Sequence, residues 1–600
     1  MLDVLKKNKS NIIACLLSLF CVVALNINLD KNVGFLYSFD GNSYVYVCLF
    51  ILFSLILRKV LEYREKRLIV CVSILSFMLV CFEIIGYSIY NYTDLSGIFY
   101  SKITLLKCFL KGIGDFLLIY STVVILYKKI FCKFEKHICG SQQNEKIKNK
   151  KMLKQFFIIW VVMFILYIPY FLTYFPGILT YDSMNQISQT LGNLELAAHH
   201  PLVHTLIVGM CIKLGILLFN SQTVGVAIYS ILQMLFMTGV FSYAIYYMGK
   251  KNINIFIRIV TFVFFAFNPI MPIYAITMWK DIPFALMMLL FIICLSELIT
   301  NKERFITSIS KNVIFIIVTL FMMLFRNNGI YVLYLSIPFI LWFSRKHWKR
   351  MLLILIIPII IYKIINGPLL LVLNIDKPSV KEALSVPLQQ LARVEINKGD
   401  QLTKEEYDQI HKFIKCDDIS KIYLTWLSDP IKESFDVEYF NENKLEFVKL
   451  WTSLFFKYPV QYFEAFFCNN VGYWYPELSY RVVERTVYKS DREWEKGLNI
   501  TANPIIDSKL VRYYDSFIER RQIPILSMVF SIGSNVWLMF ILLIYNVYKK
   551  KYINFVIFIP IIALWLTTLA SPVYAEYRYI YSLFTCLPIL LAFSIGYSKE

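Results

Sequence analysis

The chain has 600 residues, of which 58% are hydrophobic and 17% are charged, and its formal net charge is +20. Soluble domains carry about a quarter charged residues and roughly half apolar ones, so this composition excludes an ordinary soluble protein. The apolar residues occur in runs of about 17 to 25, the length that a helix needs to cross about 30 Å of hydrocarbon. We therefore expect an all-α polytopic membrane protein.

Hydropathy and loop charge together predict about fourteen membrane spans. They lie near residues 11–29, 43–57, 68–90, 103–127, 155–173, 223–247, 253–275, 281–299, 311–325, 329–344, 351–373, 523–548, 553–571 and 577–597. Basic residues cluster in short loops between the spans, for example at 250–251 and 345–350, which is typical of cytoplasmic loops. This distribution accounts for the net charge without nucleic acid. It also predicts that both termini are cytoplasmic.

The same pattern divides the chain into segments. Residues 1–127 form an expected N-terminal four-span bundle, and the basic residues 128–154 form a cytoplasmic linker. Residues 155–373 form the membrane core, and residues 523–600 form a C-terminal three-span segment. Between these two lies a predicted extracytoplasmic domain, residues 374–522, which is long enough for one small domain.

A polar loop, residues 174–222, follows the fifth span. Its sequence from 175 to 201, FPGILTYDSMNQISQTLGNLELAAHHP, places Asp182, His199 and His200 where the chain leaves the bilayer. Ionisable side chains at the edge of the bilayer are unfavourable in free energy, so we expect them there only where they are solvated and have a function. The apolar run 201–219 comes next. We interpret it as a helix lying in the outer interface, because counting it as a span would move the following basic loops outside.

Asp182 and the histidines each have competing interpretations. Asp182 is a candidate general base that accepts a proton from a hydroxyl, or it caps a short helix over 183–191. His200 and His204 are four residues apart, which is a metal-ligand spacing, but no third ligand accompanies them. The sequence therefore assigns no cofactor with certainty and leaves a divalent metal open. Tyr181, His199 and His200 are candidate substrate-binding residues, for phosphate or sugar hydroxyls.

Further charges lie at span ends that we expect on the outer face. They are Lys280, Asp281, Arg326, Glu576 and Arg578. A simple interpretation is that they form ion pairs that reach out of the bilayer. However, three cations on the side where basic residues are disfavoured also indicate a site for an anion, and arginine suits phosphate because its planar fork binds two oxygens.

The predicted domain 374–522 offers weaker indications. Its aromatic stretch FFCNNVGYWYP suits stacking on sugar rings or acyl chains, but an aromatic belt at a membrane surface looks the same. Cys416 and Cys468 lie in this segment, and whether they pair is left open.

The motifs FPGILTYDS, HHP, WKD and RNNG resemble those of polytopic GT-C glycosyltransferases, such as protein O-mannosyltransferases and lipid A aminoarabinose transferases. The resemblance covers roughly residues 150 to 373 and the last three spans, and is closest to a bacterial family within that superfamily. The chain departs from the mannosyltransferase pattern in having YDS where two acidic residues often occur, and HHPL where HPP is usual. Both departures leave the metal requirement and the substrate open.

The resemblance implies a GT-C-like bundle with interfacial helices in the first outer loop and an active site on the outer face of the cell membrane. It implies transfer of a sugar from a polyprenyl-phosphate donor to an envelope glycan, lipid or protein acceptor, with inversion. Asp182 would be the catalytic base and Asp281 a second acid, while Lys280, Arg326 and Arg578 would hold the lipid-linked phosphate. A transporter, flippase or polymerase of lipid-linked oligosaccharide is the alternative.

Overall fold

The structure is a computed structural model. It describes the chain except for residues 1, 36–42, 136–144, 479–482, 484, 486, 488–494, 496, 520–525, 571, 574 and 597–600. The described residues form helices and isolated β-bridges, so the all-helical prediction is confirmed. Part of the predicted linker 128–154 lies outside the described residues.

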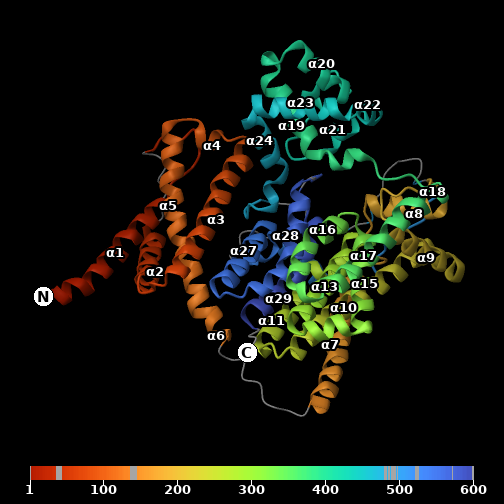
Figure 1. The fold of residues 1–600 in the computed structure, drawn as a ribbon, viewed down its shortest axis with the longest axis horizontal. Helices are drawn as coiled ribbons and strands as arrows, with labels where there is room; N and C mark the ends of the chain where they lie inside the picture. The colour runs from red at the N-terminus through yellow and green to blue at the C-terminus, as the bar shows by residue number, and fades with distance from the viewer. Residues whose placement is uncertain are drawn as a thin grey trace.

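The first helices form a bundle at one side of the molecule, drawn in red and orange in Figure 1. Its members are α1 (Leu2–Leu25), α2 (Ser43–Val60), α3 (Lys66–Tyr92), the short α4 (Ser96–Phe99), α5 (Lys102–Ile125) and α6 (Cys132–Glu135). Helix α1 packs on α2 and α5, and α3 packs on both α5 and the distant α27. The bundle therefore adjoins the last helices of the chain.

The remaining membrane helices share one large hydrophobic core. They are α7 (Glu145–Thr173), α10 (Gln222–Lys250), α11 (Ile255–Phe267), α12 (Ile270–Ala275), α13 (Asp281–Thr300), α14 (Lys302–Thr307), α15 (Ile309–Phe325), α16 (Gly329–Phe343), α17 (Trp348–Ile364), α26 (Leu526–Phe530), α27 (Ile532–Tyr548), α28 (Phe555–Ala570) and α29 (Tyr581–Ile595), whereas Leu370 of the short α18 (Leu370–Val372) packs in a small separate cluster. Helix α13 lies centrally and packs on α10, α15 and α29. Its first residue, Asp281, is therefore held by several elements.

Nine helices among the described residues are long and apolar enough to cross a membrane. All but one coincide with predicted spans, and the exception is Leu202–Phe219, which we predicted as an interfacial helix. Five shorter apolar helices coincide with other predicted spans. The predicted span 253–275 is interrupted, because Pro269 lacks an N–H group and Asn268 before it is extended. The chain is a polytopic helical membrane protein, and the count of fourteen spans stays a prediction.

Helices α8 (Tyr181–Leu191) and α9 (Leu202–Phe219) follow α7. The contacts of α9 with α10 indicate how it lies. His204 meets Tyr229, and a Cβ on Gly225 would lie 2.6 Å from the Ile212 Cα. These contacts place the His204 and Ile212 part of α9 against the first two turns of α10.

Most of the predicted domain 374–522 forms a separate helical domain, which we define as residues 385–470. Its helices are α19 (Ser385–Lys398), α20 (Lys404–Phe413), α21 (Asp429–Glu433), α22 (Val437–Glu442), α23 (Lys444–Lys457) and α24 (Pro459–Asn470), and they enclose their own core. Figure 1 shows this helical domain at the top of the molecule. A buried ion pair, Arg393 with Glu464 at 2.9 Å, also bonds residues 93–95 and so ties the helical domain to the N-terminal bundle.

The structure decides two points that the sequence left open for this segment. The aromatic residues Tyr473, Trp474 and Tyr475 are at most 5% exposed and belong to the main core, so they present no stacking surface. Cys416 and Cys468 are both free thiols, and the Cys468 thiol donates to the Thr93 carbonyl oxygen. The independent core also covers less of the chain than residues 374–522.

Candidate functional site

The loop before α8 is held against the turn before α13. Ile178 and Thr277 form a parallel β-bridge, in which the Ile178 N–H donates to the Ile276 carbonyl at 2.9 Å. Gly177, at φ +138°, allows this approach, because a Cβ there would lie 2.9 Å from the Ile276 carbonyl oxygen and 2.1 Å from the Ser230 hydroxyl oxygen of α10. The two segments therefore run side by side and bring the start of α8 to Lys280.

Asp182 is in the first turn of α8, whose N-cap is Thr180, so the interpretation of Asp182 as the cap is wrong. Its Oδ2 accepts a hydrogen bond from the Arg578 Nη1 at 2.7 Å, and the Lys280 Nζ lies 3.9 Å away. Burial alone would raise the pKa of Asp182, but Arg578 and Lys280 hold this pKa well below its usual range. The side chain is 20% exposed, so solvent reaches an ionised carboxylate.

Asp281, the first residue of α13, is more deeply placed. Its carboxylate is 1% exposed, and one oxygen lies 3.2 Å from the Arg326 Nη1. Neither oxygen has a hydrogen bond with good geometry among the described residues. Arg326 in turn donates to the Tyr579 carbonyl at 2.8 Å and lies over the Tyr579 ring. Burial makes Asp281 an orienting group for Arg326 rather than a carboxylate open to solvent.

Arg578 contacts two carboxylates of the site, those of Asp182 and Glu576. Its Nε donates to Glu576 at 2.6 Å, and its guanidinium carbon lies 5.1 Å from the Trp279 ring centroid. Burial raises the pKa of Glu576, although Arg578 opposes this effect. Trp279 is positioned by a 2.7 Å hydrogen bond from its Nε1 to the Thr180 hydroxyl. These contacts therefore hold the Arg578 guanidinium in one orientation beside Asp182.

His200 and His199 differ in their surroundings. His200 is buried, and its Nδ1 accepts from the Lys280 Nζ at 3.0 Å. Burial and the charge of Lys280 hold the pKa of His200 well below its usual value, so the ring is neutral. His199 is exposed and interacts electrostatically with Lys280 and with Glu382, which precedes the helical domain. Tyr181 is 37% exposed.

A buried chain of polar side chains supports this site, and sequence reasoning missed it. The ring nitrogens of His204 contact the Gln186 amide oxygen at 3.0 Å and the Tyr229 hydroxyl at 2.8 Å. Tyr229 donates to Gln233, whose amide nitrogen donates to three carbonyls between Tyr274 and Thr277. The network thus fixes the turn that carries Lys280. A glutamine within the apolar run of α10 was the available signal.

The metal interpretation of His200 and His204 does not fit this arrangement. Both ring nitrogens of His204 are already engaged, and one nitrogen of His200 faces the ammonium of Lys280. No group of three or more His, Cys, Asp or Glu side chains in the described part of the chain is arranged to hold a metal ion.

Six charged residues thus converge from four parts of the chain, and we call them the polar cluster: Asp182, Lys280, Asp281, Arg326, Glu576 and Arg578. Each cation is paired with at least one carboxylate. The helical domain also reaches this end of the bundle, because the Ser428 N–H donates to the Val573 carbonyl at 3.0 Å, and the segment that leads into the domain accepts a 2.8 Å hydrogen bond from the Ala198 N–H at the Asp376 carbonyl. The loops that we predicted on the same side of the membrane therefore contact one another.

Comparison with known proteins gives one match. Residues 192–600 match the model of a family described as "Family of unknown function (DUF6020)". No curated protein and no solved structure matches the chain. The matched range contains every residue of the polar cluster except Asp182.

Proposed function

We propose that this chain, which belongs to the DUF6020 family of unknown function, is a membrane glycosyltransferase that uses a polyprenyl-phosphate-linked sugar. The observation that carries the proposal is the meeting of Asp182 with Lys280 and Arg578 in a partly exposed cluster at one end of the helix bundle. A carboxylate and two cations at that place supply a base for an acceptor hydroxyl and a cradle for a phosphate.

The phosphate must compete for cations that are already paired. Phosphate carries more charge than one carboxylate and binds arginine through two oxygens, so it can take Arg578 and Lys280 from Asp182. Loss of both cations then raises the pKa of Asp182. The carboxylate becomes a better base only when the donor is bound.

The reaction follows from these positions. The acceptor hydroxyl forms a bond to the anomeric carbon, and its proton passes to the Asp182 carboxylate. The bond from the anomeric carbon to the phosphate oxygen breaks, and the electron pair leaves with polyprenyl phosphate. Lys280 and Arg578 stabilise the charge that develops on this leaving group. A single displacement inverts the anomeric configuration.

The remaining members of the polar cluster have supporting roles in this proposal. Asp281 and Glu576 orient Arg326 and Arg578, and Arg326 adds positive potential behind the phosphate. His200 accepts from Lys280 and so directs its ammonium group. The exposed His199 and Tyr181 lie where an envelope acceptor would approach.

The proposal is tested by the lipid-linked sugars of cells that lack the protein. We expect one sugar-loaded polyprenyl phosphate to accumulate in the outer leaflet. Wild-type protein should remove it, and an Asp182→Asn variant expressed at the same level should not. Accumulation confined to the inner leaflet would support a flippase instead. An unchanged set of lipid-linked sugars would contradict the proposal.

A further inference from the structure

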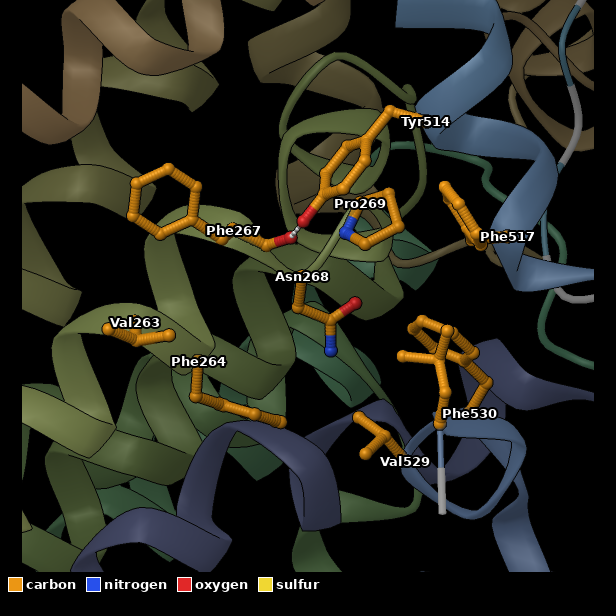
Figure 2. Close-up of a pocket in the computed structure, with 10 residues that line it drawn as sticks. Val263, Phe264, Phe267, Asn268, Pro269, Tyr514, Phe517, Val529 and Phe530 are labelled. Carbon is orange, nitrogen blue, oxygen red and sulfur yellow. Dashed lines mark hydrogen bonds between the residues drawn. The ribbon is translucent and has the colours of Figure 1, made fainter. Parts of the chain in front are cut away.

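A cavity of about 310 Å³ lies apart from the polar cluster, between the end of α11 and the segment containing α25 (Lys509–Asp515) and α26. Figure 2 shows its walls, which are mostly aromatic and aliphatic. Phe264 and Phe267 come from α11, whereas Phe517, Val529 and Phe530 come from the other side. The cavity would therefore take an apolar group.

One polar group interrupts this apolar lining. Asn268 is 6% exposed, and its amide nitrogen has no hydrogen-bond partner among the described residues. Its amide oxygen accepts from the Ile270 N–H at 3.1 Å, which fixes the orientation of the amide. In Figure 2 the nitrogen points into the space between Phe264 and Val529. A buried donor without an acceptor is unfavourable, so the cavity favours a ligand that brings an acceptor oxygen.

The surroundings of the cavity suit contact with lipid. On α11, Ile259, Val263 and Phe267 are each more than 40% exposed, so this face of the helix is apolar and uncovered. Helix α25 exposes Leu510 and Tyr513 beside its basic residues, which is the composition of a helix at a membrane interface. The Tyr514 hydroxyl donates to the Phe267 carbonyl and thus joins α25 to the cavity wall.

We propose that this cavity binds one acyl chain of an ester-linked membrane lipid, whose ester carbonyl accepts a hydrogen bond from Asn268. An acyl ester has an apolar chain that would fill the cavity. At the end of that chain it has a carbonyl oxygen that would accept the hydrogen bond from Asn268. A polyprenyl chain has no oxygen along its length and would leave Asn268 unpaired. The cavity volume is also at the low end of roughly 300 to 1,000 Å³ found for ligand sites, which suits one short chain segment.

The experiment uses the full chain in lipid nanodiscs. Two lipids with the same headgroup and the same diazirine-labelled chain are compared, one ester-linked and one ether-linked. After photolysis, mass spectrometry locates the labelled peptides. We expect the ester lipid to label peptides containing residues 263–269 and 526–530 several-fold more than the ether lipid does.

Two variants distinguish the contribution of the Asn268 amide from that of the cavity space. Asn268→Leu removes the donor and should bring ester labelling down to the ether level, whereas Val529→Trp fills the cavity and should reduce both. Equal labelling of wild-type protein by the two lipids would overturn the proposal, and this arm requires no variant. Displacement of the ester lipid by an equimolar polyprenyl phosphate would assign the cavity to the polyprenyl chain instead. Neither result depends on whether the protein transfers a sugar.

Discussion

At the scale of single residues, the polar cluster is a set of charges in balance. Asp182 and Glu576 share Arg578, while Asp281 holds Arg326. Each buried charge needs its partner, because an unpaired charge in such a place is strongly unfavourable. An entering phosphate is therefore accommodated only by rearranging pairs that already exist. This requirement couples donor binding to the basicity of Asp182.

His200 gives the cluster a dependence on pH that can be measured. Its pKa is held well below about 6.5, the value expected in the unfolded chain, so below that pH the unfolded state binds a proton that the folded state does not. Stability should therefore fall as the pH drops below about 6.5, by up to about 1.4 kcal/mol per pH unit.

The melting temperature of the purified protein tests this at pH 7.5 and pH 5.0. Gln can still accept from Lys280, so His200→Gln should fold and should lose less stability on acidification than the wild type. His347→Gln, at a half-exposed histidine far along the chain, is the matched control and should behave like the wild type. An identical loss in all three proteins would contradict the pKa shift of His200.

The sequence indicated the members of the polar cluster but not their pairing. Lys280, Arg326 and Arg578 stood out as cations on the disfavoured side of the membrane, and they do lie together. The carboxylates that neutralise them come from residues up to 396 positions away. Such pairs depend on tertiary contacts and are not visible in local spacing. The hydrogen bonds that run from His204 through Tyr229 to Gln233 also depend on tertiary contacts, so local spacing did not reveal them.

At the scale of elements, the crossing of α9 over α10 positions the start of α9 and hence His200 and His204. The helices approach closely because glycines face each other: a Cβ on Gly215 would lie 2.2 Å from the Gly225 nitrogen. Small residues at a helix crossing allow such contact in membranes. The apolar run of α9 was evident from the sequence. Its placement in the outer interface was inferred from loop charge and stays a prediction, because by length and composition α9 could also cross the membrane.

We expect Gly225→Ala to push α9 away from α10, because the new Cβ would meet the backbone of Ile212. Overpacking of this kind typically costs about 1 to 3 kcal/mol. The melting temperature should fall, and sugar transfer should decrease with it because His200 is displaced. Gly399→Ala is the control, since a Cβ at Gly399 meets nothing within 4 Å. Equal stability of the two variants would show that the crossing tolerates the methyl group.

At the scale of the whole molecule, four distant regions meet at one end of the helix bundle. They are the loop before α8, the turn before α13, the turn after α15 and the turn before α29, and the helical domain adjoins them. The positive-inside pattern grouped these regions on one membrane side before any contact was known. The docking of the helical domain on the N-terminal bundle was not foreseen, because Arg393 and Glu464 look like ordinary surface charges in the sequence.

The orientation of the molecule is a separate prediction. Glu195 is exposed in the loop after α8, so Glu195→Cys should react with a membrane-impermeant maleimide in intact cells. Lys346→Cys, in the basic loop between α16 and α17, should react only after lysis. Cys139, in the predicted cytoplasmic linker, and the half-buried Cys416 are replaced by serine in both proteins to remove background. The reverse labelling pattern would invert the assignment and place the polar cluster on the cytoplasmic side.

The central claim is that the polar cluster transfers a sugar from polyprenyl phosphate with Asp182 as the base. The most direct measurement is release of polyprenyl phosphate by the purified full chain in nanodiscs, with a panel of sugar-loaded donors and envelope acceptors. The wild type should release it with at least one donor, and Asp182→Asn should be slower by about 10² to 10⁴-fold, the range for loss of a general base. Asp507→Asn, at an exposed ion pair with Arg512, should match the wild type. Full activity of Asp182→Asn, or no release by the wild type with any donor, would contradict the account.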